Sequence, residues 1–270
     1  MSLLEAIILG VVQGLTEFLP ISSSGHLVLG ELLLGVKFDD ISFEVFLHFG
    51  TFLSVVIVFR RTIWSMFKAV WLKAKSIFVR KVVSSDREDW HLFWLIIAGS
   101  IPAGIAGVLF KNYVEKGFSS VPFVCMMLLV TGTVLILTPF FVAIRGKLNF
   151  GDALMVGLAQ ALALLPGISR SGLTISIGIF KGVERSKAAE FSFLLSLPAV
   201  LGASLLESKD VLSHTNSGQD LRIYLIGAVT AFVVGYLAIK FLLNVIRKGK
   251  FQYFGYYCFA VGLFFLFFLR

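Results

Sequence analysis

Residues 13–25 read Gln13-Gly-Leu-Thr-Glu-Phe-Leu-Pro-Ile-Ser-Ser-Ser-Gly25, and an altered copy of this stretch returns halfway along the chain. The copy reads Gln160-Ala-Leu-Ala-Leu-Leu-Pro-Gly-Ile-Ser-Arg-Ser-Gly172, so that arginine replaces the middle serine. Both copies lie inside strongly apolar sequence, where polar and ionisable groups are costly and indicate a functional cavity. Broken apolar segments at corresponding places of two halves are typical of internally repeated membrane proteins with a site between the repeats.

The composition is that of an integral membrane protein. Of the 270 residues, 57% are hydrophobic and 28 are phenylalanine, and the mean hydropathy is +0.91. Such a chain has too much apolar surface for one soluble core. The net charge of +8 comes from basic residues between apolar runs, a pattern that sets membrane topology and does not indicate a nucleic-acid partner. Cys125 and Cys258 lie within apolar runs and are expected to be free and buried.

The apolar runs predict an all-α polytopic membrane protein. Six runs are long enough for full spans, which need roughly 20 residues: about 43–60, 91–110, 121–144, 188–206, 222–246 and 251–269. Two further regions, about 2–36 and 150–181, are cut into halves by Leu-Pro and Ser-rich elements, so each predicts a re-entrant helical hairpin. Broken backbone at membrane depth needs protein or water around it. The two hairpins should therefore face each other inside the bundle.

Charges in the loops predict the orientation. The segment between about 60 and 91 is expected to be a cytoplasmic loop, because three acids (Asp86, Glu88, Asp89) face eight basic residues: Arg60, Arg61, Lys68, Lys73, Lys75, Arg80, Lys81 and Arg87. The basic loops at 145–147 and 247–250 fall on the same side. The loops at 111–120 and 207–221 are expected on the opposite, outer side of the membrane. The hairpins then enter from opposite faces, which predicts one membrane domain, 1–270, made of inverted repeats at about 1–144 and 150–270.

The first copy carries groups suited to phosphate chemistry. Gln13 and Glu17 are four residues apart, so they share one helix face that points toward the helix end at Pro20. The serines at 22–24 would then start a second helix, capping it while backbone N–H groups stay free to bind an anion. His26 follows on the first turn. A carboxylate, an imidazole, hydroxyls and amides together can bind and cleave a phosphate ester or anhydride.

The second copy adds hydroxyls and an arginine, whose planar fork suits bidentate contact with phosphate oxygens. These residues are Ser169, Arg170, Ser171 and Thr174. In the repeat, Ser23 and Arg170 occupy equivalent places. We therefore expect the two to approach one another at the midplane, with Glu17 and Arg170 sharing one ligand.

These blocks resemble the two signature blocks of the undecaprenyl-diphosphate phosphatase family, also called the bacitracin-resistance family. The resemblance rests on the stretch from Gln13 to His26, on Leu165-Pro-Gly-Ile-Ser-Arg-Ser-Gly-Leu-Thr174, and on Glu190-Phe-Ser-Phe-Leu-Leu-Ser-Leu-Pro198. It extends from the first residues to the last span. It implies a multi-pass enzyme of the bacterial inner membrane that removes one phosphate from the C55 isoprenoid diphosphate. This reaction recycles the lipid carrier of cell-wall synthesis and confers resistance to bacitracin.

The resemblance also implies roles for individual residues. Gln13 and Glu17 match the family's Glu/Gln-x-x-x-Glu element, which implies a divalent cation, Mg²⁺ or Ca²⁺, held by these two side chains. Arg170 matches the family's phosphate clamp. Either Ser23 or His26 matches the group that attacks the phosphate. Many family members have glutamate at the place of Gln13, so a two-carboxylate metal site does not carry over. One carboxylate, an amide oxygen and the substrate's own oxygens still suit magnesium.

The predicted site is therefore as follows. The catalytic residues are Glu17, Ser23, His26 and Arg170, with Ser23 attacking, His26 as its base or acid, and Glu17 orienting the histidine or the metal. The substrate-binding residues are Gln13, Ser22, Ser24, Gly25, Ser169, Ser171, Gly172 and Thr174. Glu44 and Glu190 are expected to bond hairpin backbone, and His48 to be a packing residue. The expected partners are the polyprenyl diphosphate, membrane lipid and a second copy in a homodimer.

Two other classes of function fit parts of the pattern. Inverted repeats around a midplane site are also typical of transporters, which would release no phosphate. The acid-phosphatase-like lipid phosphatases also carry a Ser-Gly-His element. They require a histidine and an aspartate after the Ser-Arg pair, and neither follows Ser169-Arg170 at that spacing. The membrane phosphatase is the interpretation that uses all of these residues.

Overall fold

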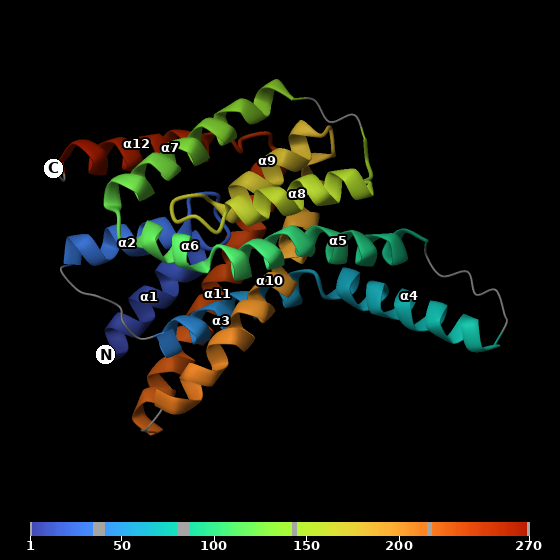
Figure 1. The fold of residues 1–270 in the computed structure, drawn as a ribbon, viewed down its shortest axis with the longest axis horizontal. Helices are drawn as coiled ribbons and strands as arrows, with labels where there is room; N and C mark the ends of the chain where they lie inside the picture. Colours follow the sequence, from blue (N-terminus) through green and yellow to red (C-terminus); the bar gives the residue numbers. More distant parts are fainter. Residues whose placement is uncertain (1, 35–40, 80–86, 142–144, 215–217, 269–270) are drawn as a thin grey trace.

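The computed structural model describes residues 2–34, 41–79, 87–141, 145–214 and 218–268, and within these ranges the chain is helical and without a β-strand. Arg80, Lys81 and Asp86, which entered the charge count, lie outside the described residues, as do the ends of three predicted segments at 35–36, 142–144 and 269. Figure 1 shows the helices, which are α1 Leu3–Thr16, α2 Ser23–Leu34, α3 Ile41–Val58, α4 Arg60–Val79, α5 Arg87–Leu109, α6 Lys111–Phe118, α7 Val121–Leu137, η1 Thr138–Phe140, α8 Phe150–Leu162, α9 Arg170–Phe180, α10 Arg185–His214, α11 Gly218–Arg247 and α12 Tyr253–Phe268.

Both predicted hairpin regions are helix pairs that break where the sequence indicated. The first pair, α1 and α2, has 14 and 12 residues, and the second pair, α8 and α9, has 13 and 11. At 1.5 Å per residue these helices are only about 16–21 Å long, which is shorter than a hydrocarbon core of about 30 Å. Ser169 caps α9, because its hydroxyl accepts a hydrogen bond from the N–H of Gly172.

Among the described residues, three helical segments are long and apolar enough to cross a membrane: α5, α7 with η1, and α11. A fourth span exists if α3 and α4, which are bent by 76° at their junction, count as one. The helix α12, predicted as a full span, has 16 residues and is a shorter apolar helix. The chain is thus an all-helical protein with helices able to span a membrane, whereas six full-length spans are not confirmed.

The prediction of loops at 60–91, 111–120 and 207–221 was wrong for most of their residues. The first contains α4 and the second α6, and the third is largely taken up by the end of α10 and the start of α11. A search for long apolar runs misses helices that are apolar on one face only. In α4, the basic residues Arg61, Lys68 and Lys75 recur every seven residues on one side. Its apolar residues include the buried Met66 and the exposed Trp64 and Trp71.

Small residues bring α1 close to α11. A Cβ atom on Gly10 would lie 2.7 Å from the carbonyl oxygen of Gly227, and one on Gly14 would lie 2.9 Å from that of Ala231. Both distances are shorter than side-chain contacts permit, so only glycine allows this approach. The close contact fixes the helix that carries Gln13 and ends at Glu17.

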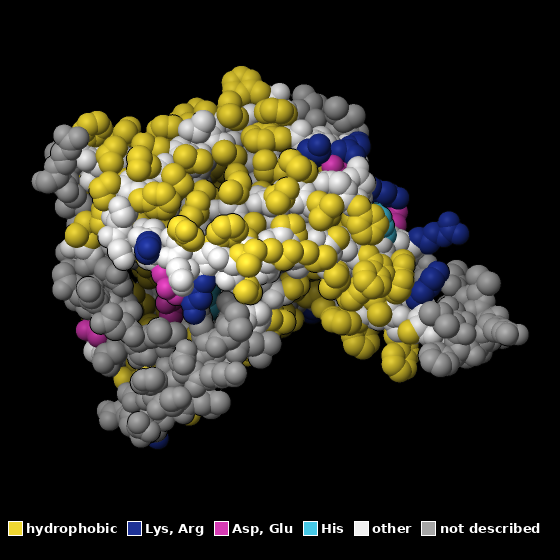
Figure 2. All heavy atoms as spheres, viewed as in Figure 1, with side chains coloured by type: hydrophobic (Ala, Val, Ile, Leu, Met, Phe, Trp, Pro, Cys, Tyr) yellow, Lys and Arg dark blue, Asp and Glu magenta, His cyan; other side chains and the backbone are white. Residues whose placement is uncertain are grey.

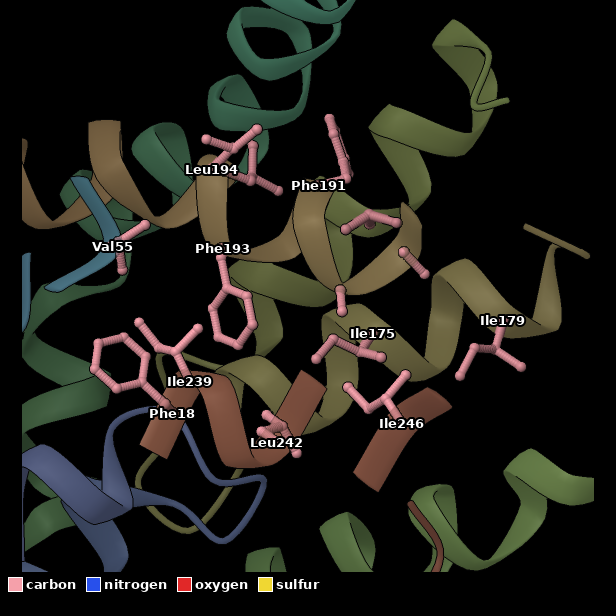
Figure 3. Packing of buried hydrophobic residues seen from close by; sticks show 14 of the residues in the cluster. Phe18, Val55, Ile175, Ile179, Phe191, Phe193, Leu194, Ile239, Leu242 and Ile246 are labelled. Carbon is pink, nitrogen blue, oxygen red and sulfur yellow. The ribbon is translucent and has the colours of Figure 1, made fainter. Parts of the chain in front are cut away.

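The core lies between α3, α9, α10, α11 and the turn after α1 (Figure 3). Phe18, in that turn, is 1% exposed, and its ring meets Phe193 of α10 edge to face, with ring centroids 5.8 Å apart. Such aromatic contacts hold a ring in one orientation. Because Phe18 follows Glu17 directly, its burial also fixes the place of the glutamate.

The surface agrees with a protein surrounded by lipid. Figure 2 shows hydrophobic side chains over most of one face, with most of the Lys and Arg side chains in view gathered at one end of the molecule. Exposed side chains on the long apolar helices include Ile101, Ile105, Val229 and Leu237. Apolar surface of this extent is expected where acyl chains replace water.

Candidate active site

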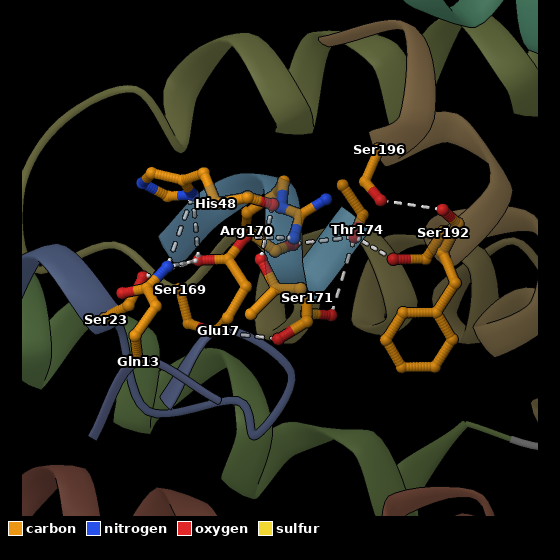
Figure 4. Close-up of polar contacts among 12 residues, drawn as sticks. Gln13, Glu17, Ser23, His48, Ser169, Arg170, Ser171, Thr174, Ser192 and Ser196 are labelled. Carbon is orange, nitrogen blue, oxygen red and sulfur yellow. Dashed lines mark hydrogen bonds and ion pairs between the residues drawn. The ribbon is translucent and has the colours of Figure 1, made fainter. Parts of the chain in front are cut away.

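The turns of the two broken helix pairs meet at an ion pair between Glu17 and Arg170 (Figure 4). Glu17 ends α1 and Arg170 begins α9. A guanidinium nitrogen, Nη2 of Arg170, lies 2.6 Å from Oε1 of Glu17, and the two side chains are only 19% and 8% exposed. A charge-assisted hydrogen bond of this length offsets the cost of burying both charges. The prediction that these two residues lie close together is confirmed, whereas the prediction that they share one ligand stays a prediction.

The second carboxylate oxygen of Glu17 accepts two further hydrogen bonds. Ser23, the first residue of α2, donates its hydroxyl at 3.0 Å, and Gln13 donates its amide Nε2 at 3.1 Å. Ser23 and Arg170 therefore bond opposite oxygens of one carboxylate, and the predicted approach of these equivalent residues is confirmed. A serine hydroxyl bonded to a carboxylate has a proton acceptor in place.

The two turns are built alike. In the first, the hydroxyl of Ser22 accepts from the N–H of Gly25 at 3.2 Å and lies 3.2 Å from that of Ser24. In the second, the hydroxyl of Ser169 accepts from Gly172 at 3.1 Å and lies 3.3 Å from that of Ser171. Each glycine packs on the other turn: a Cβ on Gly25 would be 3.2 Å from Gly167, and one on Gly172 would be 3.2 Å from Pro20. A side chain at either point would require its neighbour in the other turn to shift by a few tenths of an ångström.

Ser22 takes a left-handed backbone conformation, with φ of 69°. This region is strained for a residue with a side chain. Two hydrogen bonds to its carbonyl oxygen hold it there, from the backbone N–H of His26 at 3.1 Å and from the Nδ1 of the same residue at 2.8 Å. The strained residue aims the next one, Ser23, at Glu17.

The polar side chains of the predicted site divide into two groups by their exposure. Ser22, Ser169, Ser171 and Thr174 are buried, at 3% exposure or less, and their hydroxyls bond within the turns or to neighbouring helices. Thr174, for example, donates to the carbonyl oxygen of Arg170 at 2.6 Å and lies 2.6 Å from the hydroxyl of Ser192 in α10. Ser23, Ser24 and Arg170 are partly exposed. The buried group positions Arg170, and the partly exposed group can reach a ligand.

The ring nitrogens of His26 have partners other than Ser23. Its Nδ1 donates to the carbonyl oxygen of Ser22, because a carbonyl can only accept. Its Nε2 is then the acceptor for the hydroxyl of Tyr257 in α12, at 2.8 Å, and the two rings stack with centroids 5.6 Å apart. No contact between His26 and Ser23 is among those of the described residues. The catalytic role of His26 stays a prediction.

His48 in α3 belongs to the cluster, and its assignment as a packing residue was wrong. Its Nδ1 lies 3.2 Å from Nε2 of Gln13 and 4.0 Å from Oε2 of Glu17. Its Nε2 lies 3.8 Å from Oε1 of Glu44. The sequence held a signal, because Glu44 and His48 are one helical turn apart in an otherwise apolar helix. This contact of Glu44 is to a side chain and not to hairpin backbone.

Glu190, like Glu44, bonds side chains where hairpin backbone was expected. It accepts from the hydroxyl of Thr62 at 3.0 Å and from Nζ of Lys187 at 3.2 Å. These three residues line a pocket of about 370 Å³ at the starts of α4, α5 and α10, where Lys147 also pairs with Glu88. None of the predicted catalytic residues lines this pocket.

A family model and several relatives match nearly the whole chain. The family model described as bacitracin resistance protein BacA matches residues 6–264. The chain belongs to the BacA family. It is 45% identical to the undecaprenyl-diphosphatase of Desulforapulum autotrophicum over 270 residues, covering 97% of both chains. It is 45% identical to that of Halothermothrix orenii, covering 97% of this chain and 96% of the relative, and 46% identical to that of Desulfosudis oleivorans, covering 96% of each.

The oxygen atoms of this BacA-family site fit a divalent cation that is shared with a ligand. The described part of the chain contains no group of three or more His, Cys, Asp or Glu side chains that could hold a metal by itself. Glu17 supplies one carboxylate, and Oε1 of Gln13 is buried and has no hydrogen-bond partner. Mg²⁺ prefers oxygen ligands, keeps several waters and commonly binds through one carboxylate plus phosphate oxygens.

Proposed function

We propose that this chain hydrolyses the terminal phosphate of undecaprenyl diphosphate, leaving the monophosphate and inorganic phosphate. Its relatives at 45–46% identity over nearly their whole length are named for this activity. The observation that carries the proposal is the carboxylate of Glu17, which bonds Ser23 on one oxygen and Arg170 on the other. The reaction recycles the lipid carrier of cell-wall synthesis and so confers bacitracin resistance, in the bacterial inner membrane.

In the first step Ser23 attacks the terminal phosphorus. Its hydroxyl proton passes to Oε2 of Glu17, to which it is already hydrogen-bonded at 3.0 Å. The bond from Oγ to phosphorus forms as the bond from phosphorus to the bridging oxygen breaks, with its electron pair remaining on the lipid monophosphate. A phosphate leaving group carries this charge well and needs no proton. The products of the step are phosphoserine, protonated Glu17 and the recycled carrier lipid.

In the second step water attacks the phosphoserine. The bond from phosphorus to Oγ breaks, and Glu17 returns its proton to that oxygen. The two protons of the water leave on the inorganic phosphate, so atoms and charge balance. One carboxylate thus acts as base and then as acid.

Arg170 stabilises the phosphoryl group during transfer. Arginine has five N–H donors in a planar fork, and the bond to Glu17 uses Nη2, so the other donors are available for phosphate oxygens. The amino-terminal ends of α2 and α9 lie beside it, and the unpaired N–H groups of a helix start favour an anion. Electrostatic stabilisation of this kind is the main contribution to catalysis of phosphoryl transfer.

A divalent cation, Mg²⁺ or Ca²⁺, would be held by Glu17, Oε1 of Gln13 and the diphosphate itself. When bound it would neutralise charge on the phosphate oxygens. The proposal rests on the unpartnered buried oxygen of Gln13 and on the preference of these ions for oxygen ligands.

The proposal includes two re-entrant hairpins within six spans, in inverted repeats. Support comes from the four short helices α1, α2, α8 and α9 and from the matching hydrogen bonds in their turns. Helices of this length that surround a polar cluster suit a membrane only if other helices cover them. The lipid tail would lie between spans, and a homodimer remains part of the proposal.

The test is phosphate release by the purified protein in detergent, with undecaprenyl diphosphate as substrate. Wild type should release inorganic phosphate, and Arg170→Ala and Ser23→Ala should reduce the rate by at least about 10²-fold. Ser65→Ala is a matched control, because its hydroxyl bonds the carbonyl of Thr62 in α4, and it should behave as wild type. A folded wild-type protein that releases no phosphate would overturn the function and favour a transporter.

The same assay identifies the nucleophile and the cation. Protein quenched with acid during turnover should carry an acid-stable phosphoserine that is absent from Ser23→Ala. An acid-labile phosphohistidine would instead assign the attack to His26. Chelator should abolish the activity and added Mg²⁺ should restore it, whereas full activity in chelator would remove the cation from the proposal.

A further inference from the structure

The amide group of Gln13 can be assigned atom by atom from its neighbours. One of its terminal atoms lies 3.1 Å from Oε2 of Glu17 and 3.2 Å from Nδ1 of His48. A carboxylate oxygen only accepts hydrogen bonds, so the atom beside it must be the NH₂ group. One amide hydrogen then points to Glu17 and the other to His48. The imidazole Nδ1 must therefore carry no proton and act as an acceptor.

The tautomer of His48 follows from the same contacts. With Nδ1 as acceptor, a neutral ring carries its proton on Nε2. That nitrogen lies 3.8 Å from Oε1 of Glu44, one helical turn earlier in α3. The negative charge of the carboxylate favours a proton on the nitrogen that faces it. Glu44, His48 and Gln13 thus form a chain in which each group fixes the orientation of the next.

At the end of this chain is an oxygen that has no partner in the protein. Gln13 is 1% exposed, and its Oε1 forms no hydrogen bond. A buried acceptor without a donor is costly and rare in folded proteins. An electropositive group in contact with this oxygen, such as a divalent cation, would satisfy it, whereas an NH₂ group in its place would repel one.

We propose that His48 is a positioning residue, which holds the Gln13 amide so that its oxygen, and not its nitrogen, faces the cation that accompanies the diphosphate. An amide must be oriented because its oxygen accepts hydrogen bonds while its NH₂ group donates them, whereas both oxygens of a carboxylate accept. The inference rests on the proposed function for the identity of the ligand. The orientation itself follows from the contacts of Gln13.

The first test replaces His48 while keeping its shape. His48→Phe retains a ring and removes the acceptor, and His48→Asn retains an acceptor oxygen close to the place of Nδ1. The readouts are the Mg²⁺ midpoint for protection against thermal unfolding, measured without substrate, and kcat/KM for phosphate release. Loss of a group that orients a metal ligand costs about 10–100-fold in affinity or activity. His48→Phe should shift both readouts by that factor, and His48→Asn should stay within about threefold of wild type.

The second test asks whether His48 acts through Gln13. In a Gln13→Ala background, His48→Phe should cause no further change, because there is no amide left to orient. His91→Phe is the matched control, since His91 meets Phe150 edge to face and lines the other pocket, and it should leave both readouts unchanged. If His48→Phe does not fold, His48→Met serves the same purpose.

Three results would overturn the proposal: a folded His48→Phe protein with the wild-type Mg²⁺ midpoint, an effect of equal size in the Gln13→Ala background, or a folded His48→Asn protein as impaired as His48→Phe. Failure of the proposed function would look different. The wild-type protein would then release no phosphate, while the Mg²⁺ midpoints would still report on the role of His48.

Discussion

Glu17→Gln separates the charge of the central carboxylate from its shape. The substitution keeps the length of the side chain and one oxygen that can still accept from Arg170. It removes the negative charge and the capacity to take a proton from Ser23, which now donates to Glu17 at 3.0 Å. If Glu17 is the base, the variant should fold and be almost inactive.

The size of each effect can be worked out from the contacts. General-base catalysis contributes about 10²–10⁴-fold, so loss of the base should raise the barrier by about 2.7–5.4 kcal/mol at 1.36 kcal/mol per tenfold. The bond from Arg170, 2.6 Å in the wild type, changes from charge-assisted to one with a neutral acceptor. Such bonds differ by about 1–2 kcal/mol, and leaving a buried charge without its counter-ion costs up to about 3–5 kcal/mol, so the free energy of unfolding should fall by about 1–5 kcal/mol.

The measurement pairs the initial rate of phosphate release with the melting temperature in detergent. Glu88→Gln is the matched control, since Glu88 is 74% exposed and pairs with Lys147 at the far pocket, and it should keep wild-type activity. A Glu17→Gln protein that melts near the wild-type temperature and retains more than about a third of the rate would show that the carboxylate is not the base.

Three further predictions concern other contacts. Arg170→Lys keeps the charge but loses the fork that binds Glu17 and phosphate together, so the rate of phosphate release should fall about 10²-fold; a near-normal rate would refute bidentate binding. Tyr257→Phe removes the hydroxyl bonded to His26 at 2.8 Å and should lower stability by about 1 kcal/mol, seen as an earlier melt. Gly157→Ala would put a Cβ 2.2 Å from a carbonyl oxygen of α5 and should cost about 1–3 kcal/mol, whereas Gly104→Ala, with nothing within 4 Å, should melt no earlier than wild type.

The contacts that the sequence predicted correctly are those between the two copies of the motif, whereas the roles of these residues stay predictions. Glu17, Ser23 and Arg170 belong to two copies of one motif, and equivalent places in inverted repeats meet near their common axis. Their contact at 2.6–3.0 Å could therefore be predicted without knowing how the other helices pack.

The residues that the sequence missed come from elsewhere in the chain. His48 is 35 residues from Gln13, and Tyr257 is 231 residues from His26. His48 has a local signal in Glu44, one helical turn earlier, but that pair does not say what the histidine faces. Tyr257 has no such signal, because a tyrosine in an apolar helix is more often a packing residue. Which side of α3 or α12 faces the turns depends on the packing of the whole bundle. The same reason explains why the sequence could not separate buried hydroxyls from accessible ones.

The helix α4 was missed for a different reason. A search for spans averages hydropathy along the chain, and the lysines and arginines of α4 lower that average. The helix nevertheless has a periodic pattern, because Arg61, Lys68 and Lys75 recur every seven residues on one side. Periodicity within 60–79, and not mean hydropathy, was the informative quantity there.

The ion pair at the centre of the molecule also sets an order of events during synthesis. Glu17 and Arg170 are separated by 153 residues, which a ribosome takes about 8–30 s to add at 5–20 residues per second. During that interval the glutamate has left the ribosome and its counter-ion does not yet exist. The first half must therefore wait at the membrane with an unneutralised acid, shielded by water or by the insertion machinery, until the second half arrives.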